Sequence, residues 1–121
     1  MNDLDAILRN MLNKTLYVAL RKPRNLHRVS DALPRHIEWM LDAERHGDIF
    51  LSGPFMGEGQ PGEHGGMTIL RAPSLDGAQR LIAADPFIAE GVFDAEVKPW
   101  LLMEGSLTCT IRLSNQRASI D

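Results

Sequence analysis

The order of apolar patterns between residues 15 and 104 restricts the possible fold more than any other feature of this sequence. A strand pattern at 15–21 carries apolar residues on both faces, which is typical of a central strand. The patterns that follow give the order strand, helix, strand, strand, helix, strand, which is the split βαβ arrangement. The sequence therefore predicts one α+β domain over residues 15–104, with a four-stranded antiparallel sheet.

The limits of these elements follow from capping residues and prolines. The first helix is predicted to begin after Ser30 or Asp31, since either side chain can cap free N–H groups, and to end at Gly47. Pro99 interrupts the ladder of the last strand, which favours an edge position for that strand. The other predicted elements are strands at 48–55, 66–72 and 91–104 and a second helix from Ser74 to about Ala84.

Three further segments lie around this pattern. Residues 1–14 show helical spacing of apolar residues and predict a short amphipathic helix before the domain. Residues 54–65 are rich in glycine and predict a mobile surface loop that could act as a lid. Residues 105–113 alternate like a strand that may pair with an edge of a partner chain, and the tail at 114–121 is expected to be frayed.

Composition and charge exclude several classes of protein. A net charge of −3 and a pI near 5.8 argue against nucleic-acid binding, and no apolar run is long enough to span a membrane. Since residues 1–12 do not resemble a signal peptide, we expect a cytoplasmic protein. The single cysteine, Cys109, allows no internal disulfide, and the histidines lack metal-ligand spacing, so neither a metal nor a cofactor is expected. The basic residues Arg21, Lys22, Arg24 and Arg35 could attract a carboxylate near a pocket, but they are interpreted as a solvated basic surface.

Several short motifs occur in a defined order within residues 15–102. They are His36 in the first helix, Gly47 at its end, Ser52-Gly53-Pro54, Gly66, Asp85-Pro86-Phe87, Gly91-Val92-Phe93 and Pro99-Trp100. Through this ordered set the chain resembles the YCII-related family over most of its length. It departs from the family pattern before Leu16, in the basic loop at 22–28 and after Gly105.

The resemblance implies a ferredoxin-like domain that pairs into a homodimeric α+β barrel and binds a small-molecule ligand. It also implies a cleft in which His36 and Asp85 form an active-site pair, with Ser52, Gly53 and Pro54 lining the same pocket. The best-understood relatives act on chlorinated hydroquinones or lactone-like rings, and muconolactone isomerases have a similar architecture.

The residues themselves allow this chemistry and also a simpler interpretation. His36 lies on the flank of an apolar helical stripe, near the helix start, where the helix dipole would keep its ring neutral as a general base requires. A carboxylate beside the ring would fix its tautomer. However, a histidine here can be purely structural, and Asp85 before Pro86 can simply cap a helical turn.

No activated nucleophile accompanies this pair, because Ser52 does not lie in a nucleophile elbow, so proton transfer is favoured. The predicted activity is that of an isomerase or a lyase, through isomerisation or elimination such as dehydrochlorination of a small cyclic or aromatic acid or lactone. Two other classes stay open. One is a binding or sensor module without turnover, and the other is a structural dimer in which Trp39 or Trp100 fills the cleft.

Overall fold

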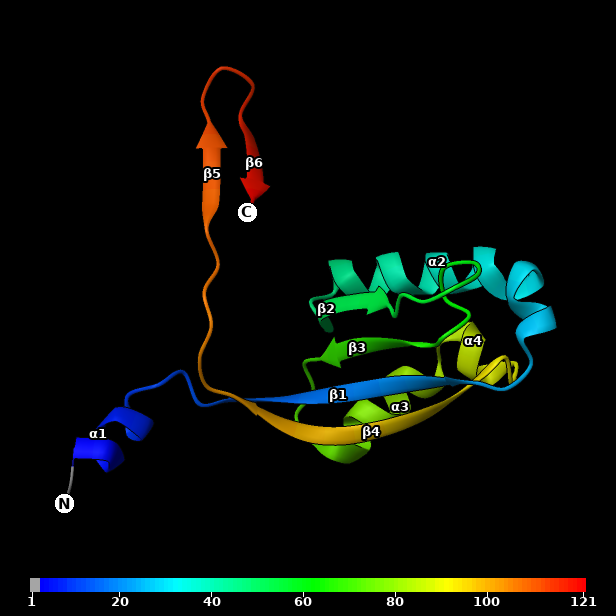
Figure 1. Cartoon of the computed structure of the whole chain (residues 1–121), viewed down its shortest axis with the longest axis horizontal. Coiled ribbons are helices and arrows are strands. Elements are labelled where there is room, and N and C mark those ends of the chain that lie inside the picture. Colours follow the sequence, from blue (N-terminus) through cyan, green and yellow to red (C-terminus); the bar gives the residue numbers. More distant parts are fainter. Residues whose placement is uncertain (1–2) are drawn as a thin grey trace. The chain divides into compact units, whose positions relative to one another are not determined.

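The computed structural model describes residues 3–121, which divide into two compact units. The larger unit covers residues 15–101, and the smaller one joins the described residues before 15 to residues 102–121. In residues 3–121 no helix is long and apolar enough to cross a membrane. The elements of the larger unit are β1 Lys14–Pro23, a 3-10 turn Leu26–Arg28, α2 Val29–Arg45, β2 Ile49–Pro54, β3 Gly66–Leu70, α3 Leu75–Ala83, α4 Pro86–Ala89 and β4 Phe93–Leu102 (Figure 1).

The four strands form one sheet in the order β2-β3-β1-β4. β3 pairs antiparallel with both β1 and β2, and its register with β1 places Val18 opposite Ile69 and Leu20 opposite Met67. The apolar first strand is central and the proline-containing last strand lies at an edge, as predicted. The ferredoxin-like α+β fold expected from the sequence is therefore confirmed.

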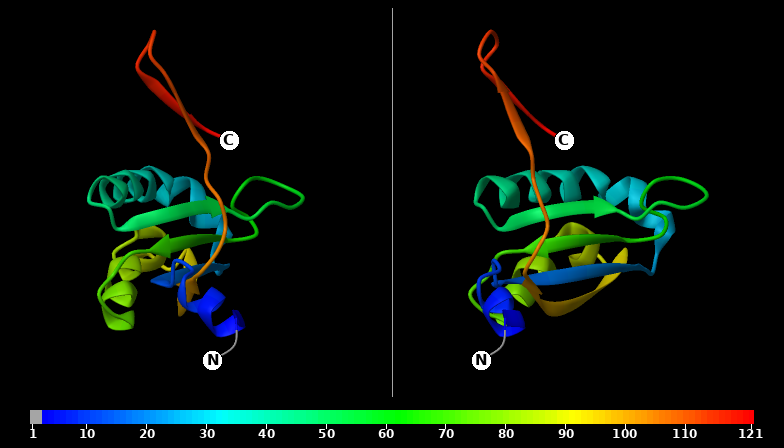
Figure 2. Two further views of the ribbon diagram at one scale, coloured as in Figure 1. Left: turned by 90° about the vertical axis from the view of Figure 1, so that its left-hand side faces the viewer. Right: turned by 60° about the vertical axis from the view of Figure 1, so that its left-hand side comes forward.

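The main core lies between one face of the sheet and the helices α2 and α3 (Figure 2). A second buried cluster forms where α4 packs near the start of α2. The main core contains Tyr17, Ala19, Ala43, Ile49, Leu70, Ala78 and Ile82, and the second cluster contains Ala32, Phe87, Val92 and Phe93.

The opposite face of the sheet is also apolar. Since neighbouring strand residues point to opposite faces, Leu16, Val18 and Leu20 alternate with the core residues of β1 and lie on this second face. Met67 and Ile69 join them from β3 through the pairing described above. The helices α2 and α3 pack on the other face; on this second face Leu16 and Ile69 are buried, whereas Val18, Leu20 and Met67 remain half-buried.

Two boundaries differ from the prediction. Neither Ser30 nor Asp31 caps α2, because the 3-10 turn before Val29 already brings the chain into a helical conformation. β4 covers Phe93–Leu102 and is two residues shorter at each end than the predicted strand at 91–104; it continues through Pro99, since a proline on an edge strand can direct its missing N–H away from the ladder. Ser74 caps α3 by accepting a bond from the Gly77 amide, as expected.

The smaller unit contains α1 Asp3–Arg9 and a hairpin of β5 Cys109–Arg112 and β6 Arg117–Ile120. The helix predicted before the domain is present, and the side chain of Asn13 donates hydrogen bonds to three carbonyls near its end. The strand expected after Gly105 is also present. However, the tail expected to be frayed supplies the turn and β6, which pairs antiparallel with β5.

Candidate functional site

A cavity of about 410 Å³ opens between α2, the ends of β1 and β2, and the loop before β3. Its lining is mainly apolar and includes Leu33 and Ile37 of α2 together with Phe87 and Phe93. The glycine-rich loop at 55–65 contributes Pro61 to the wall. A cavity of this size suits a small organic ring, since ligand sites usually measure about 300 to 1,000 Å³.

The structure brings all the predicted site residues to this cavity. His36, Ser52, Gly53 and Pro54 line it directly. Asp85 is fully buried and does not line the cavity, but it contacts two residues that do, His36 and Arg21. Trp39 and Trp100 are absent from the lining, so the alternative in which a tryptophan fills the cleft finds no support.

His36 is held from two directions. Its Nδ1 lies 2.7 Å from Oδ1 of Asp85, and its ring stacks on Phe87 with the centroids 4.0 Å apart and the planes at 11°. The side chain is only 14% exposed. His36 lies about two turns inside α2, beyond the first turn over which a helix dipole is effective, so Asp85 and not the helix end decides its tautomer.

Asp85 has a capping role as well as a histidine contact. As the N-cap of α4, its Oδ1 accepts a hydrogen bond of 3.0 Å from the Phe87 amide, and Pro86 occupies the first helical position. The same oxygen faces His36. The two interpretations of this residue are therefore compatible, because the cap orients the carboxylate toward the imidazole.

Arg21 binds the other oxygen of this carboxylate. Its Nε and Nη2 donate to Oδ2 of Asp85 at 2.9 and 2.7 Å, and its Nη1 donates to the hydroxyl of Thr68. The prediction of a solvated basic surface is wrong for Arg21, which is 7% exposed because it shares the inward face of β1 with Tyr17 and Ala19. The alternation along β1 was the sequence signal that could have identified Arg21 as buried. Thr68 was missed because the same alternation along β3 was not used.

The Thr68 hydroxyl extends the network to Ser52. The two hydroxyl oxygens are 2.7 Å apart, and Ser52 lies at the cavity wall. Hydrogen bonds therefore connect Ser52, Thr68, Arg21, Asp85 and His36 in one chain whose two ends face the same cavity. We call these five residues the buried network.

The charges within the buried network compensate one another. Burial raises the pKa of the Asp85 carboxyl, but the hydrogen bond to His36 and the positive charge of Arg21 outweigh it, so this pKa lies below its ordinary value. Asp85 is thus a carboxylate at neutral pH, paired with one guanidinium. Apart from His36, Arg21 is the one ionisable side chain in the described lining, so the cavity offers no unpaired charge.

Close backbone contacts shape the rim of the cavity. Gly65 has a φ of +80°, and a Cβ at this position would overlap the carbonyl oxygen of Arg21. A Cβ on Gly66 would come within 2.8 Å of the carbonyl oxygen of Gly53. Glycine is therefore required at both positions if the loop is to approach β1 and β2 this closely.

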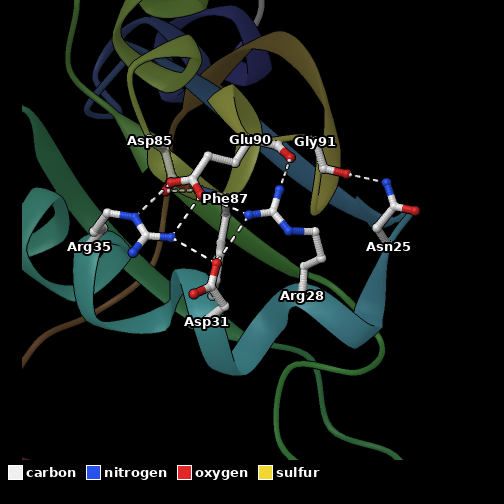
Figure 3. A network of polar contacts seen from close by, with 8 residues as sticks. All are labelled: Asn25, Arg28, Asp31, Arg35, Asp85, Phe87, Glu90 and Gly91. Carbon is white, nitrogen blue, oxygen red and sulfur yellow. Dashed lines mark hydrogen bonds and ion pairs between the residues drawn. The ribbon is translucent and has the colours of Figure 1, made fainter.

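A second set of charges joins α2 to the segment that follows α4 (Figure 3). Nε and Nη2 of Arg35 donate to the two carboxylate oxygens of Glu90 at 2.9 and 2.8 Å. Arg28 donates to the backbone and side chain of Glu90, and Asp31 accepts from both arginines. The hydrogen bond from Arg35 lowers the pKa of Glu90. We call these four residues the surface network.

Comparison with known proteins agrees with the fold. The model of the YCII-related domain matches residues 14–101. Among solved structures, 5-chloro-2-hydroxyhydroquinone dehydrochlorinase (TftG) from Burkholderia phenoliruptrix, in complex with 2,5-dihydroxybenzoquinone, is similar with a TM-score of 0.59 and 26% identity. The match covers 70% of this chain and 92% of that one. No curated protein sequence matches the chain.

Proposed function

Because this chain belongs to the YCII-related domain family, we propose that it is a small-molecule enzyme in which His36 removes a proton from a ring compound. The observation that carries the proposal is the contact of 2.7 Å between Nδ1 of His36 and Oδ1 of buried Asp85, at the wall of a mainly apolar cavity. A histidine held in this way is suited to general acid and base catalysis.

The contact with Asp85 determines which nitrogen reacts. Since the carboxylate is ionised, it accepts the Nδ1 hydrogen, and the lone pair of Nε2 is then available to the cavity. When Nε2 takes a proton, the adjacent carboxylate stabilises the imidazolium. Arg21 keeps Asp85 from taking that proton itself, because the guanidinium favours the charged carboxylate.

The buried network also supplies a donor for the substrate. Arg21 donates to Thr68, and when the Thr68 hydroxyl donates in turn to Ser52, the hydrogen of Ser52 is left for a ligand oxygen. Gly53 and Pro54 complete this wall. A ring with one hydroxyl or carbonyl at Ser52 and an acidic proton at His36 fits this arrangement.

The charge balance favours a neutral ring over a carboxylic acid. A carboxylate would enter a cavity whose one cation, Arg21, is already bonded to Asp85 and Thr68, and would lose its hydration without a partner. A phenol, a hydroquinone or a lactone does not meet this penalty. The related dehydrochlorinase also binds a small ring, 2,5-dihydroxybenzoquinone.

The proposed reaction begins when His36 accepts a proton from the ring or its hydroxyl. In an elimination from a chlorinated hydroquinone, His36 moves a hydroxyl proton to the carbon that bears chlorine, which becomes tetrahedral and leaves a ring ketone. Loss of a second hydroxyl proton then forms a carbonyl and a new ring double bond and expels chloride, so that HCl is lost and a quinone remains. In an isomerisation, His36 returns the proton to another carbon. The loop at 55–65 would cover the cavity during this step and exclude water.

We also propose that the functional form is a homodimer. The second apolar face of the sheet, with Val18 and Leu20 on β1 and Met67 on β3, would pack on the same face of another copy to close a barrel. A Leu20→Lys substitution should convert the dimer to a monomer in analytical ultracentrifugation. A monomeric wild type would contradict this assembly.

The test of function compares wild type with His36→Ala and with His27→Ala, an exposed control outside the cavity. Chloride release from 5-chloro-2-hydroxyhydroquinone should fall by about 10²- to 10⁴-fold in His36→Ala, the usual contribution of a general base, and stay unchanged in His27→Ala. If the ring compound binds without turnover in the wild type, the protein is a binding or sensor module. Equal rates in both variants would eliminate His36 as the base.

A further inference from the structure

Phe87 contacts both members of the proposed dyad. Its backbone N–H donates to Oδ1 of Asp85 at 3.0 Å, and the same oxygen faces Nδ1 of His36. Its ring lies nearly parallel to the imidazole, with the centroids 4.0 Å apart and the planes at 11°. One residue therefore holds the carboxylate through its backbone and the histidine through its side chain.

The contact with Asp85 does not fix the plane of the His36 ring by itself. The outer torsion of a histidine side chain has broad energy wells, so a ring held only at Nδ1 can still tilt. A tilt displaces Nε2, the nitrogen that takes the proton in the proposed reaction, because the two nitrogens lie at different places on the ring. A flat surface against the ring face limits this motion.

Phe87 provides the flat surface nearest to this ring. The ring of Trp39 has its centroid 6.3 Å from that of His36 and its plane at 28°, so the contact with Phe87 is closer and more parallel. Phe87 and His36 also line the same cavity. The stacked pair is thus part of the wall that a bound ring would meet.

Phe87 is itself fixed in the fold. It lies in the first turn of α4, and its carbonyl accepts a hydrogen bond of 3.0 Å from the Val92 amide. The side chain is 7% exposed and packs on Phe93, with the centroids 5.1 Å apart and the planes at 56°. Such a tilted arrangement is favourable for two aromatic rings. A side chain held at its backbone and at its ring can orient a neighbour.

We infer that Phe87 is a positioning residue, whose ring sets the plane of His36 so that Nε2 meets the substrate. Asp85 selects the tautomer and Phe87 selects the orientation, which are separate conditions for the same proton transfer. The effect on turnover rests on the proposed function. The orientation of His36 does not, because it can be measured without a substrate.

The first test measures the motion of the His36 ring in the full-length, substrate-free protein. NMR relaxation of its Cε1–Hε1 group should show a larger amplitude of motion in Phe87→Leu than in wild type, because leucine keeps apolar bulk but has no flat face. Phe93→Leu is the matched control. It removes a phenyl ring from the same buried cluster and cavity wall, but within residues 3–121 Phe93 packs on Phe87 and has no ring contact with His36.

The ¹⁵N signals of the His36 ring separate this role from that of Asp85. Phe87→Leu retains the carboxylate and the backbone N–H at position 87, so the tautomer pattern should stay as in wild type. An altered tautomer in this variant would show that Phe87 acts by holding Asp85, and the inference would be wrong.

The second test asks whether the orientation matters for turnover of 5-chloro-2-hydroxyhydroquinone. In Phe87→Leu, kcat should fall by about 10- to 100-fold, the usual effect of a misplaced reacting group, while KM changes less. Replacement of Phe87 by 4-fluorophenylalanine keeps the flat ring and should retain most of kcat. Phe50→Leu, an aromatic residue outside the cavity lining, controls for the general loss of a phenyl ring.

Two results would overturn the inference. One is a His36 ring that moves no more in Phe87→Leu than in wild type, or as much in Phe93→Leu. The other is a more mobile ring with unchanged kcat. If Phe87→Leu does not fold, Phe87→Met makes the same comparison, because its unbranched side chain adapts to irregular spaces. A wild type without turnover would contradict the proposed function alone, since the motion of the ring still decides whether Phe87 positions His36.

Discussion

The buried network and the surface network use the same side-chain chemistry in two different environments. Both connect α2 with the segment around α4, and both pair arginine with carboxylate at 2.7 to 2.9 Å. In the buried network Arg21 and Asp85 are 7% and 0% exposed, whereas Arg35 and Asp31 in the surface network are 47% and 67% exposed. Hydrogen-bond length does not distinguish them, and solvent access does.

This difference in solvent access determines how much each network contributes to stability. Water and salt screen the surface charges, so either partner can be removed at little cost. In the buried network Arg21, Thr68 and Asp85 depend on one another, because a buried partner left alone has no water to replace the lost one. The dyad of His36 and Asp85 thus belongs to the network whose geometry the fold can hold rigid.

The largest expected effect comes from removing the carboxylate of the buried network. Asp85→Ala should lower the free energy of unfolding by about 3–5 kcal/mol, since it leaves Arg21 buried without its partner and also removes the cap of α4. Glu90→Ala, the matched change in the surface network, should cost much less. Urea denaturation of both variants measures the difference, and equal losses would contradict the distinction.

A smaller effect is expected inside the same network from Thr68→Val, which keeps the shape and removes the hydroxyl. It should destabilise the protein by about 1–3 kcal/mol, because Nη1 of Arg21 loses its acceptor in a fully buried position. Ser52→Ala is the control, since Ser52 is exposed and water can replace its hydroxyl. If Thr68→Val left the free energy of unfolding unchanged, Arg21 would not depend on this bond.

These contrasts also show what the sequence could predict. The periodicity of residues 15–104 was sufficient for the order of strands and helices, because each element buries one regular face. His36 and Asp85 were identified through family motifs, and in the structure their side chains are in contact. Their roles in catalysis stay predictions.

Arg21 and Thr68 were missed because their partners lie far away in the sequence. Arg21 shares the alternation of Tyr17 and Ala19, but a single arginine in a basic segment resembles any solvated one until its position is compared with the core. The β6 strand was missed for a different reason. Its residues alternate correctly but have no core to mark them as ordered.

Lowering the pH tests the difference between the buried and the surface network. The pKa of Asp85 is lowered in the folded protein, so its contribution to stability is complete above its unfolded value of about 3.9 and is lost as the pH falls through the lower folded value. The pKa values of Asp31 and Glu90 are also lowered, but Asp31 is exposed and Glu90 only half-buried, so high salt should weaken their contribution to stability. Urea titrations from pH 7 to pH 3 in high salt should show a steeper loss below about pH 4 in wild type than in Asp85→Asn. If the stability of wild type and of Asp85→Asn fell in parallel with pH, Asp85 would not be the source of the acid-dependent loss.

The smallest effect is expected from Glu90→Gln, which removes the charge of the surface network and keeps its shape. The variant should be slightly less stable at low salt and match the wild type at high salt, because the lost interactions are exposed. The ¹⁵N signals of the His36 ring should keep their tautomer pattern in Glu90→Gln, whereas Asp85→Asn should change that pattern by removing the carboxylate that faces Nδ1. If Glu90→Gln disturbed the His36 tautomer as strongly as Asp85→Asn does, the surface network would be positioning the histidine, and solvent access would no longer separate the two networks.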